Sequence, residues 1–414
     1  MFDLDKWQEI LQTITRNKSR SLLTAFGIFW GVFMLVFLMG GGEGLRKLMA
    51  SNFEGLAQNS GFVMKGKAAK AYGGFKSGRE WNLQISDVDL LQRRVPALET
   101  VTPIMGAWGQ TATRNHHSTN ATLKGVLPEY ANIEAPHITL GRFLNDSDVQ
   151  TYRKVCVIGK RIWETLFPDM DNPCGQFICV GGVYYQVVGV SKMSSDIGVM
   201  GSAESTVIIP YSTFARLYNR GTTIESIGFT ARRGHTITEL TPFVEETLRK
   251  AHTLAPDDKR AILLINMEAM FQMIDSLFAG IDTLVWLIGL GTLLSGAIGV
   301  SNIMMVTVRE RTAEIGIRRA IGARPRHILT QIMAESMVLT VLAGMSGIIF
   351  AVLLLQGVES VLLAQGTEAS FQVSFSTAIG STVALCLLGS AAGIAPSLRA
   401  LAIKPIEAIR DEKP

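Results

Sequence analysis

The sequence has few cysteines and few charged residues, and both shortages narrow the class of protein. Four cysteines in 414 residues are too few for a disulfide framework. Charged residues make up only 18% of the chain, against about 25% in a typical soluble protein, while hydrophobic residues make up 48%. The net charge of +4 is too small to predict nucleic-acid binding. The composition therefore favours a protein that contacts membrane lipid.

Motifs for nucleotide binding, metal binding or nucleophilic catalysis are also lacking. The glycine-rich stretch "GGGEGLRK" at residues 40–47 follows an apolar segment rather than a strand, and it lacks the Lys-Ser/Thr pair of a P-loop. His116 and His117 are neighbours, and adjacent residues rarely reach the same metal ion. We therefore predict no catalytic residue, no metal site and no cofactor bound by this chain.

Two of the cysteines allow one local pairing. Cys174 and Cys179 flank a predicted hairpin, and an oxidising compartment would permit a disulfide between them. A disulfide and two free thiols both remain open from the sequence.

Four apolar segments are long enough to cross a membrane. A spanning helix needs about 20 mostly apolar residues, because the bilayer core cannot hydrogen-bond a bare backbone. We predict membrane spans at residues 21–42, 277–308, 328–355 and 375–396, the last one closed by Pro396. The first apolar run is too long for the core of a signal peptide, so we expect an uncleaved anchor.

Basic residues in the short flanking segments predict the orientation, because they resist translocation. Segment 1–20, expected to form an amphipathic helix, segment 309–327 and the tail 397–414 all carry several Lys or Arg, whereas loop 356–374 carries none. We therefore place both termini and segment 309–327 in the cytoplasm. The large domain at 43–276 then lies in the periplasm, and the chain is a multi-pass protein of the cell inner membrane.

Residues 43–276 combine two kinds of pattern. Short β-branched runs such as "KVCVIG" and "STVIIP" predict strands, and "TITELTPFVEETLRKAH" predicts an amphipathic helix. We expect an α+β domain, with a strand-rich subdomain inserted near residues 113–205. The predicted fold class is a membrane α-helical protein of four transmembrane helices, with a large extracytoplasmic α+β domain between the first and second spans.

Segment 309–327 reads "RERTAEIGIRRAIGARPRH" and predicts a short amphipathic helix at the cytoplasmic membrane surface. Its acids and bases recur at helical spacing beside a narrow apolar stripe. An anchor in the lipid headgroups explains the basic residues, but not the interspersed Glu310 and Glu314. A docking surface for a soluble partner explains both signs, so we favour docking. The candidate docking residues are Arg309, Glu310, Arg311, Glu314, Ile317, Arg318, Arg319 and Gly322.

Inside the predicted spans, small residues and one acid have candidate roles. Small residues four apart allow helices to approach closely. Glu335 is placed about two turns from the cytoplasmic end of its span, where it either orients segment 309–327 or reaches back toward water. The candidate packing residues are Gly27, Gly31, Gly291, Ser295 and Gly299.

The stretch "VTVRERTAEIGIRRAIGARPRHILTQIMAES" resembles the cytoplasmic turn of the FtsX-like permeases, the macrolide-exporter and lipoprotein-release branch of ABC transporters. "RNKSRSLLTAFGIFWGV" is similar to the first span of that family. "VCVIGKRIWETLFPDMDNPCGQFICVGGVYYQVVGV" with "IIPYSTF" resembles its periplasmic core domain, and "GIAPSLRALAIKPIEAIRDE" resembles its closing span and tail. The fragments occur in the family's order and cover nearly the whole chain.

The resemblance implies a non-catalytic permease subunit that works as a homodimer, or as a heterodimer with a similar permease. Residues 309–323 match the family's coupling helix, so an ABC ATPase subunit would dock there and carry the ATP and magnesium. Motion of the external domain would then drive efflux or export of a drug, peptide or lipoprotein. A membrane-fusion adaptor and an outer-membrane channel are further implied partners. The alternative is a signalling or scaffold protein of the same family, which controls cell-envelope enzymes without transport.

Overall fold

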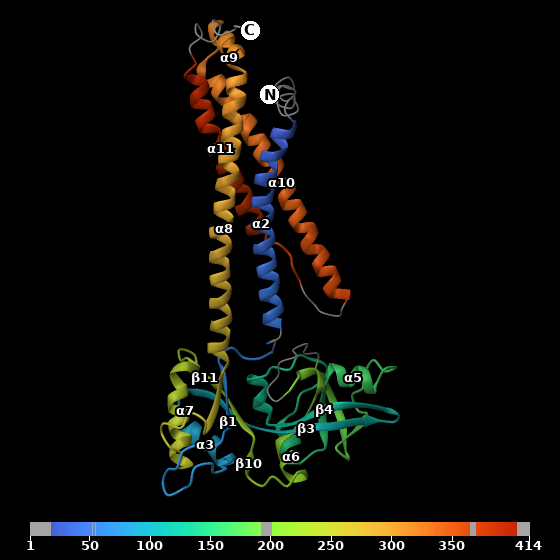
Figure 1. Cartoon of the computed structure of the whole chain (residues 1–414). Coiled ribbons are helices and arrows are strands. Elements are labelled where there is room, and N and C mark those ends of the chain that lie inside the picture. The colour runs from blue at the N-terminus through green and yellow to red at the C-terminus, as the bar shows by residue number, and fades with distance from the viewer. Residues whose placement is uncertain (1–17, 52, 54, 192–200, 365–369, 404–414) are drawn as a thin grey trace. The chain divides into compact units, whose positions relative to one another are not determined.

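The computed structural model describes residues 18–403 apart from 52, 54, 192–200 and 365–369. The chain divides into two compact units (Figure 1). One unit is Met49–Ser276, and the other combines Met1–Leu48 with Leu277–Pro414. The helix predicted at 1–20 falls outside the described residues up to residue 17, and so does the predicted tail from residue 404.

Among the described residues, four helices have the length and composition to cross a membrane. The predicted number of spans is therefore confirmed. The helices are α2 (Lys18–Ser51), α8 (Met267–Glu310), α10 (Pro325–Ala364) and α11 (Phe375–Leu401). Each is longer than the predicted span, because the helix continues beyond the apolar core into flanks of mixed polarity. Pro396 does not end the last span as predicted, since it lies inside α11; a proline is tolerated there when neighbouring groups satisfy the freed carbonyl.

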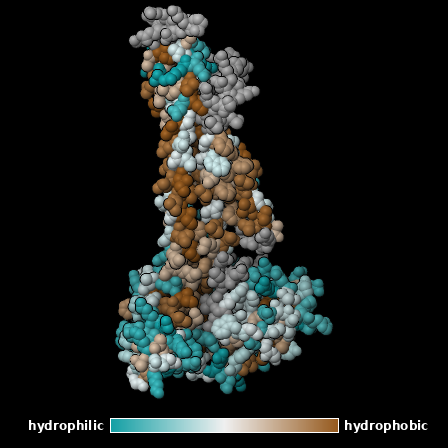
Figure 2. Space-filling model, in the orientation of Figure 1, coloured by the Kyte–Doolittle hydropathy of each residue, from teal (hydrophilic) through white to brown (hydrophobic). Residues whose placement is uncertain are grey.

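Small residues allow close packing inside the helical unit. A Cβ on Gly31 of α2 would lie 3.4 Å from the backbone of Thr292, and one on Gly27 would lie 4.0 Å from Gly296. A Cβ on Gly347 of α10 would lie only 2.7 Å from the carbonyl oxygen of Phe29. The outward surface of these helices is largely apolar (Figure 2), as expected for segments that face lipid.

The predicted packing row on α8 is partly wrong. Gly291 and Ser295 are exposed, and a Cβ on Gly291 would meet nothing within 4 Å. Gly299 is half-buried. The glycines of α8 that approach α2 are Gly289, beside Leu35, and Gly296, beside Ile28. Small residues at a spacing of four occur on both faces of α8, so the spacing alone did not identify the packed face.

The unit Met49–Ser276 is built on a mixed sheet of ten described strands in the order β12-β1-β11-β3-β4-β9-β6-β8-β5, with β7 paired to β3 and β8. A two-stranded sheet, β2 (Leu83–Gln84) with β10 (Thr223–Ile224), accompanies it. The ten strands are β1 (Ser60–Lys65), β3 (Leu98–Arg114), β4 (His117–Val126), β5 (Ile138–Gly141), β6 (Val155–Gly159), β7 (Phe177–Val180), β8 (Val183–Ser191), β9 (Thr206–Pro210), β11 (Ser226–Ala231) and β12 (Ile262–Asn266).

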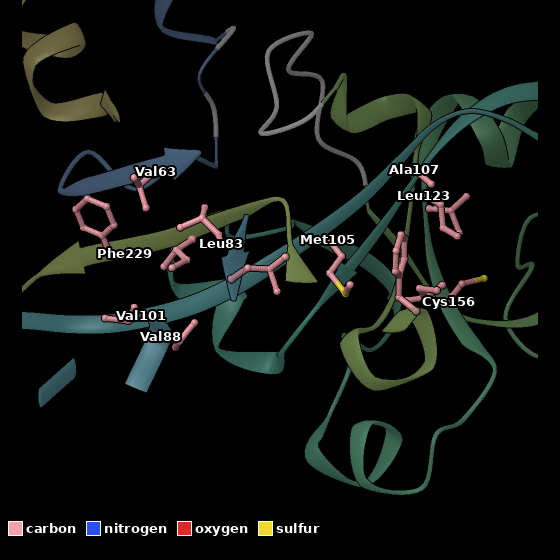
Figure 3. Close-up of a cluster of buried hydrophobic side chains, with 14 of the residues drawn as sticks. Val63, Leu83, Val88, Val101, Met105, Ala107, Leu123, Cys156 and Phe229 are labelled. Carbon is pink, nitrogen blue, oxygen red and sulfur yellow. The ribbon is translucent and has the colours of Figure 1, made fainter. Parts of the chain in front are cut away.

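Helices pack on this sheet and confirm the α+β class. The α-helices are α3 (Ile85–Arg94), α4 (Asp146–Gln150), α5 (Lys160–Leu166), α6 (Tyr211–Leu217) and α7 (Ile237–Ala251), and the 3₁₀ turns are η1 (Pro128–Asn132) and η2 (Ala203–Ser205). The larger core includes Val63, Val101, Met105 and Phe229 from the sheet and Val88 from α3 (Figure 3). Alternate residues of the same strands enter a second core, which contains Phe62 and Ile104, because successive side chains point to opposite faces of a strand.

The predicted subdomain boundary at residue 113 is wrong. Residue 113 lies inside β3, whose 17 residues pair with β11 at one end and with β4 along most of their length. At the other predicted boundary, β9 pairs in parallel with β4 from Thr206 onward. The strands within 113–205 therefore extend the same sheet, and backbone hydrogen bonds cross both proposed boundaries.

The proposed disulfide is also absent, because Cys174 and Cys179 are both free thiols. The amide of Gly175, next to Cys174, donates to Val187, whereas Cys179 pairs with Tyr184. Positions 184 and 187 lie three residues apart on β8, which corresponds to about 10 Å along a strand. That separation exceeds the roughly 7 Å that a disulfide can span between Cα atoms.

Candidate functional site

The segment predicted as a coupling helix forms a shorter helix, α9 (Thr312–Ala320). Its predicted start at 309 is wrong, since Arg309 and Glu310 complete α8. Gly322, with φ of +97°, follows the C-cap, and the amide of Ala323 donates to the carbonyl of Arg318 at 3.0 Å. This is the Schellman pattern, which favours glycine because the residue must adopt a left-handed conformation. The chain then enters α10 at Pro325.

Arg311 joins the end of α8 to the next membrane helix. Its Nη1 donates to Oε1 of Glu335 on α10 at 3.2 Å. The side chain of Glu335 is only 4% exposed and that of Arg311 is 19% exposed. A carboxylate removed from water needs such a partner, because an unpaired buried charge is strongly destabilising. Glu335 therefore orients the start of α9 and does not reach back toward water.

Arg318 makes a second link between α9 and α10. It pairs with Glu314 one turn earlier on α9 at 2.8 Å and donates to the side chain of Gln331 on α10 at 3.1 Å. Glu314 also lies 3.8 Å from Arg311. Glu314 is in the first turn of α9 and Arg318 in the last, so each charge also complements the helix dipole. These side chains line a small cavity beneath α9, together with Met304, Thr307, Val308, Ile315, Ile328 and Ile332.

Arg319 joins α9 to the last membrane helix. Its Nη1 donates to the carbonyl of Leu401 at 2.8 Å and to that of Ile403. The final carbonyls of a helix have no partner within the helix, so Arg319 satisfies the end of α11. Arg311, Arg318 and Arg319 together fix α9 to both α10 and α11. We therefore expect the three helices to move together.

The opposite face of α9 is apolar and open. Ile317 is 47% exposed and Ile321, one turn further on, is 82% exposed. Arg309 and Glu310 are also exposed, at the end of α8. Ile315 and Gly316 face inward instead. We call Arg309, Glu310, Ile317 and Ile321 the α9 surface.

The residues that were predicted as one docking helix therefore fall into two groups, one that contacts other helices and one that is exposed. The predicted residues Arg311, Glu314, Arg318 and Arg319 fix α9 in place, and the residues of the α9 surface are exposed. Gln331 and the carbonyls of Leu401 and Ile403 could not be recognised from the sequence, because their roles depend on how α10 and α11 meet α9. One signal was available: an acid inside a span requires a partner, and Arg311 stands at the end of the preceding helix.

A second buried polar cluster lies in the unit Met49–Ser276. Nζ of Lys124 is 2.7 Å from Oε2 of Glu134, and the hydroxyl of Tyr130 donates to the same oxygen. All three side chains are at most 4% exposed. Burial, and then the neighbouring Glu134 carboxylate, raise the pKa of Tyr130 well above its usual value. Glu134 pairs with Leu56 across a β-bridge, so the cluster holds the segment that follows α2 against β4. We regard it as structural.

Among the described residues, no group of three His, Cys, Asp or Glu side chains could hold a metal ion.

Comparison with known proteins gives two matching families. Residues 21–244 match the MacB-like periplasmic core domain, and residues 286–405 match the FtsX-like permease C-terminal region. The macrolide export ATP-binding/permease protein MacB of Bdellovibrio bacteriovorus is 30% identical over 402 residues, covering 97% of this chain and 61% of the relative. The protein of the same name from Mannheimia succiniciproducens is 29% identical over 413 residues, covering 99% of this chain and 61% of the relative.

This chain thus spans 61% of the length of each of those two relatives. Among solved structures, the periplasmic region of MacB from Actinobacillus actinomycetemcomitans aligns with 55% of this chain and 98% of its own length. The identity is 24% and the TM-score is 0.43.

Proposed function

The chain belongs to the family with a MacB-like periplasmic core domain, and from that membership we propose that it is the membrane-spanning permease of an ABC exporter. In this proposal α9 lies in the cytoplasm, as the basic flanks predict, and the unit Met49–Ser276 lies in the periplasm. A separate ATPase subunit supplies ATP hydrolysis, and this chain carries no catalytic residue. The match of residues 21–244 favours the exporter over the signalling alternative.

The observation that carries the proposal is the α9 surface. Ile317 and Ile321 are exposed, as are Arg309 and Glu310 at the end of α8. Helix α9 itself is fixed to the membrane helices by Arg311, Arg318 and Arg319. A lipid anchor would need the apolar stripe, but it would not need α9 to be fixed to two other helices. A docked ATPase needs an exposed apolar stripe to bind and a helix that is fixed to its neighbours. Only then does its movement displace the membrane helices rather than α9 alone.

The proposed cycle is a transfer of motion. Closure of two ATPase subunits on ATP would displace the α9 surfaces of two permease chains, arranged as a homodimer or a heterodimer. Since α8 is one helix from Met267 to Glu310, a displacement at Glu310 can be carried along it to the periplasmic unit. An adaptor and an outer-membrane channel would then receive the substrate.

A co-purification experiment tests this proposal. The tagged chain is purified from its native membranes, and bound ATPase is quantified by mass spectrometry and by ATP hydrolysis. Ile317→Asp should reduce the bound ATPase at least tenfold without lowering the melting temperature, because the side chain is exposed and a charge there disrupts only an apolar contact.

Leu263→Asp is the matched control, since Leu263 is 51% exposed but lies on β12. Glu314→Arg is less informative, because it would also break the pairs with Arg311 and Arg318. Equal ATPase recovery with Ile317→Asp and with the unaltered chain would contradict the proposal.

A further inference from the structure

Helix α8 starts without a linker at the end of a strand. Strand β12 ends at Asn266, and α8 begins at Met267. The side-chain oxygen of Asn266 accepts from the amide of Ala269 at 3.0 Å and so caps the first turn of α8. A displacement of this turn therefore reaches its neighbours without being absorbed by a loop. The first residue of α8 with a charged side chain is Glu268.

Glu268 binds the start of another helix. Its Oε2 accepts from the amide of Ile237 at 2.6 Å and from the amide of Thr238 at 3.3 Å, which are the first two residues of α7. The first amides of a helix have no partner within the helix, and a negative charge there also complements the dipole. Asn266 adds a third contact, from its side-chain amide to the hydroxyl of Thr238 at 2.9 Å.

This contact differs from an ordinary helix cap. Helix α7 already has a local cap, since the hydroxyl of Thr236 accepts from the amide of Glu239 at 3.2 Å. The two remaining amides could be satisfied by solvent or by a nearby residue. They are instead satisfied by a carboxylate about 30 residues further along the chain, on the helix that continues toward the membrane. The long-range contact fixes the first turn of α7 to the first turn of α8.

The other end of α7 is fixed to α3. His252, the C-cap residue of α7, lies with its Nε2 2.8 Å from Oδ2 of Asp87. The His252 ring also lies 4.8 Å from that of Trp81. Asp87 accepts from the amide of Gln84 at the start of α3, so one carboxylate joins the end of α7 to the beginning of α3. Helix α7 is therefore held at one end by α8 and at the other by α3.

We propose that Glu268 is a positioning residue that delivers movement of α8 to α7 and, through His252 and Asp87, to α3. This rests on the proposed function, in which α8 moves during the ATPase cycle. The role of Glu268 is to make α7 and α3 follow the first turn of α8, so that the surface of the periplasmic unit changes when ATP is bound.

Hydrogen exchange of the complex purified from native membranes tests this, with and without magnesium ATP and vanadate. In the unaltered complex, nucleotide should change the exchange of amides in the first turn of α8, in α7 and in α3. Glu268→Ala should keep the response of α8 and reduce the response of α3 at least fivefold. Glu239→Ala is the matched control, because Glu239 is also in the first turn of α7 but its side chain is 64% exposed.

A second variant tests the same route at a different residue, so that the result does not depend on whether Glu268→Ala folds correctly. His252→Phe retains a ring beside Trp81 but loses the bond to Asp87, so α7 should respond to nucleotide and α3 should not. An unchanged α3 response in both Glu268→Ala and His252→Phe would overturn this inference alone. Absence of any nucleotide response in α8 of the unaltered complex would overturn the proposed function, and this inference with it.

Discussion

Oε1 of Glu335 and Nη1 of Arg311 lie 3.2 Å apart and join α10 to the end of α8 at the base of α9. Glu335 is an acid within a largely apolar helix, and its side chain is almost entirely buried. Its charge is compensated by Arg311, 24 positions earlier in the chain. The two residues meet because the chain turns back through α9 before it enters α10. The pair makes the orientation of α9 depend on the packing of the membrane helices.

Removing one member of this pair should destabilise the helical unit. Glu335→Ala leaves the largely buried Arg311 guanidinium without this partner, and loss of one partner of a buried pair costs about 3–5 kcal/mol. Thermal unfolding in detergent micelles should show a clear decrease in melting temperature. The double variant Glu335→Met with Arg311→Met should recover much of the loss, since it leaves no unpaired charge. A melting temperature for Glu335→Ala equal to that of the unaltered chain would refute this account of the pair.

Two glycine substitutions should differ sharply. Gly347→Ala places a Cβ 2.7 Å from the carbonyl oxygen of Phe29, and this backbone atom of α2 cannot move aside easily. We expect α2 and α10 to separate and the melting temperature to fall. Gly291→Ala meets open space and should leave stability unchanged or slightly improved, because alanine favours helix. The same melting experiment checks both, and a larger effect at Gly291 would contradict the packing described.

The natural cysteines test the orientation. Cys174 and Cys179 are partly exposed, whereas Cys156 is fully buried, and burial raises the pKa of the Cys156 thiol. Thiolate is the reactive form. In intact spheroplasts, a membrane-impermeant maleimide should label a peptide containing Cys174 or Cys179, and Cys156 should react only after denaturation. Labelling of Cys174 and Cys179 only after the membrane is opened would place residues 49–276 on the cytoplasmic side.

The four spans and the α+β class could be predicted because each depends on local patterns. Apolar length alone identifies a membrane helix, and short β-branched runs bounded by turn residues identify strands such as β6 and β9. The ends of α2, α8 and α10 could not be predicted, because they lie in sequence of mixed polarity that is compatible with both helix and loop. The insertion boundary at 113 failed for a related reason: nothing in the sequence shows that β3 continues unbroken through it.

The segment that holds the candidate site was predicted correctly. The prediction did not separate the residues that contact other helices from those that are exposed. Arg318 and Ile317 are neighbours in the sequence, yet Arg318 contacts Gln331 of α10 while Ile317 is exposed. Which side of α9 faces inward depends on contacts with α10 and α11 that are 13 to 84 residues away in sequence. The link between Glu268 and α7 was missed for the same reason, since a lone glutamate at the start of a helix gives no sign of a distant partner.

The most direct test of the central claim is photo-crosslinking from the α9 surface in living cells. A photoreactive amino acid at Ile321, the more exposed of the two isoleucines at 82%, should give a crosslinked product that contains a nucleotide-binding ATPase subunit. The same probe at Ile315, which is 8% exposed on the inward side of α9, should give none. Crosslinks from Ile321 to lipid alone, with no ATPase product, would show that α9 is a membrane anchor and contradict the docking account.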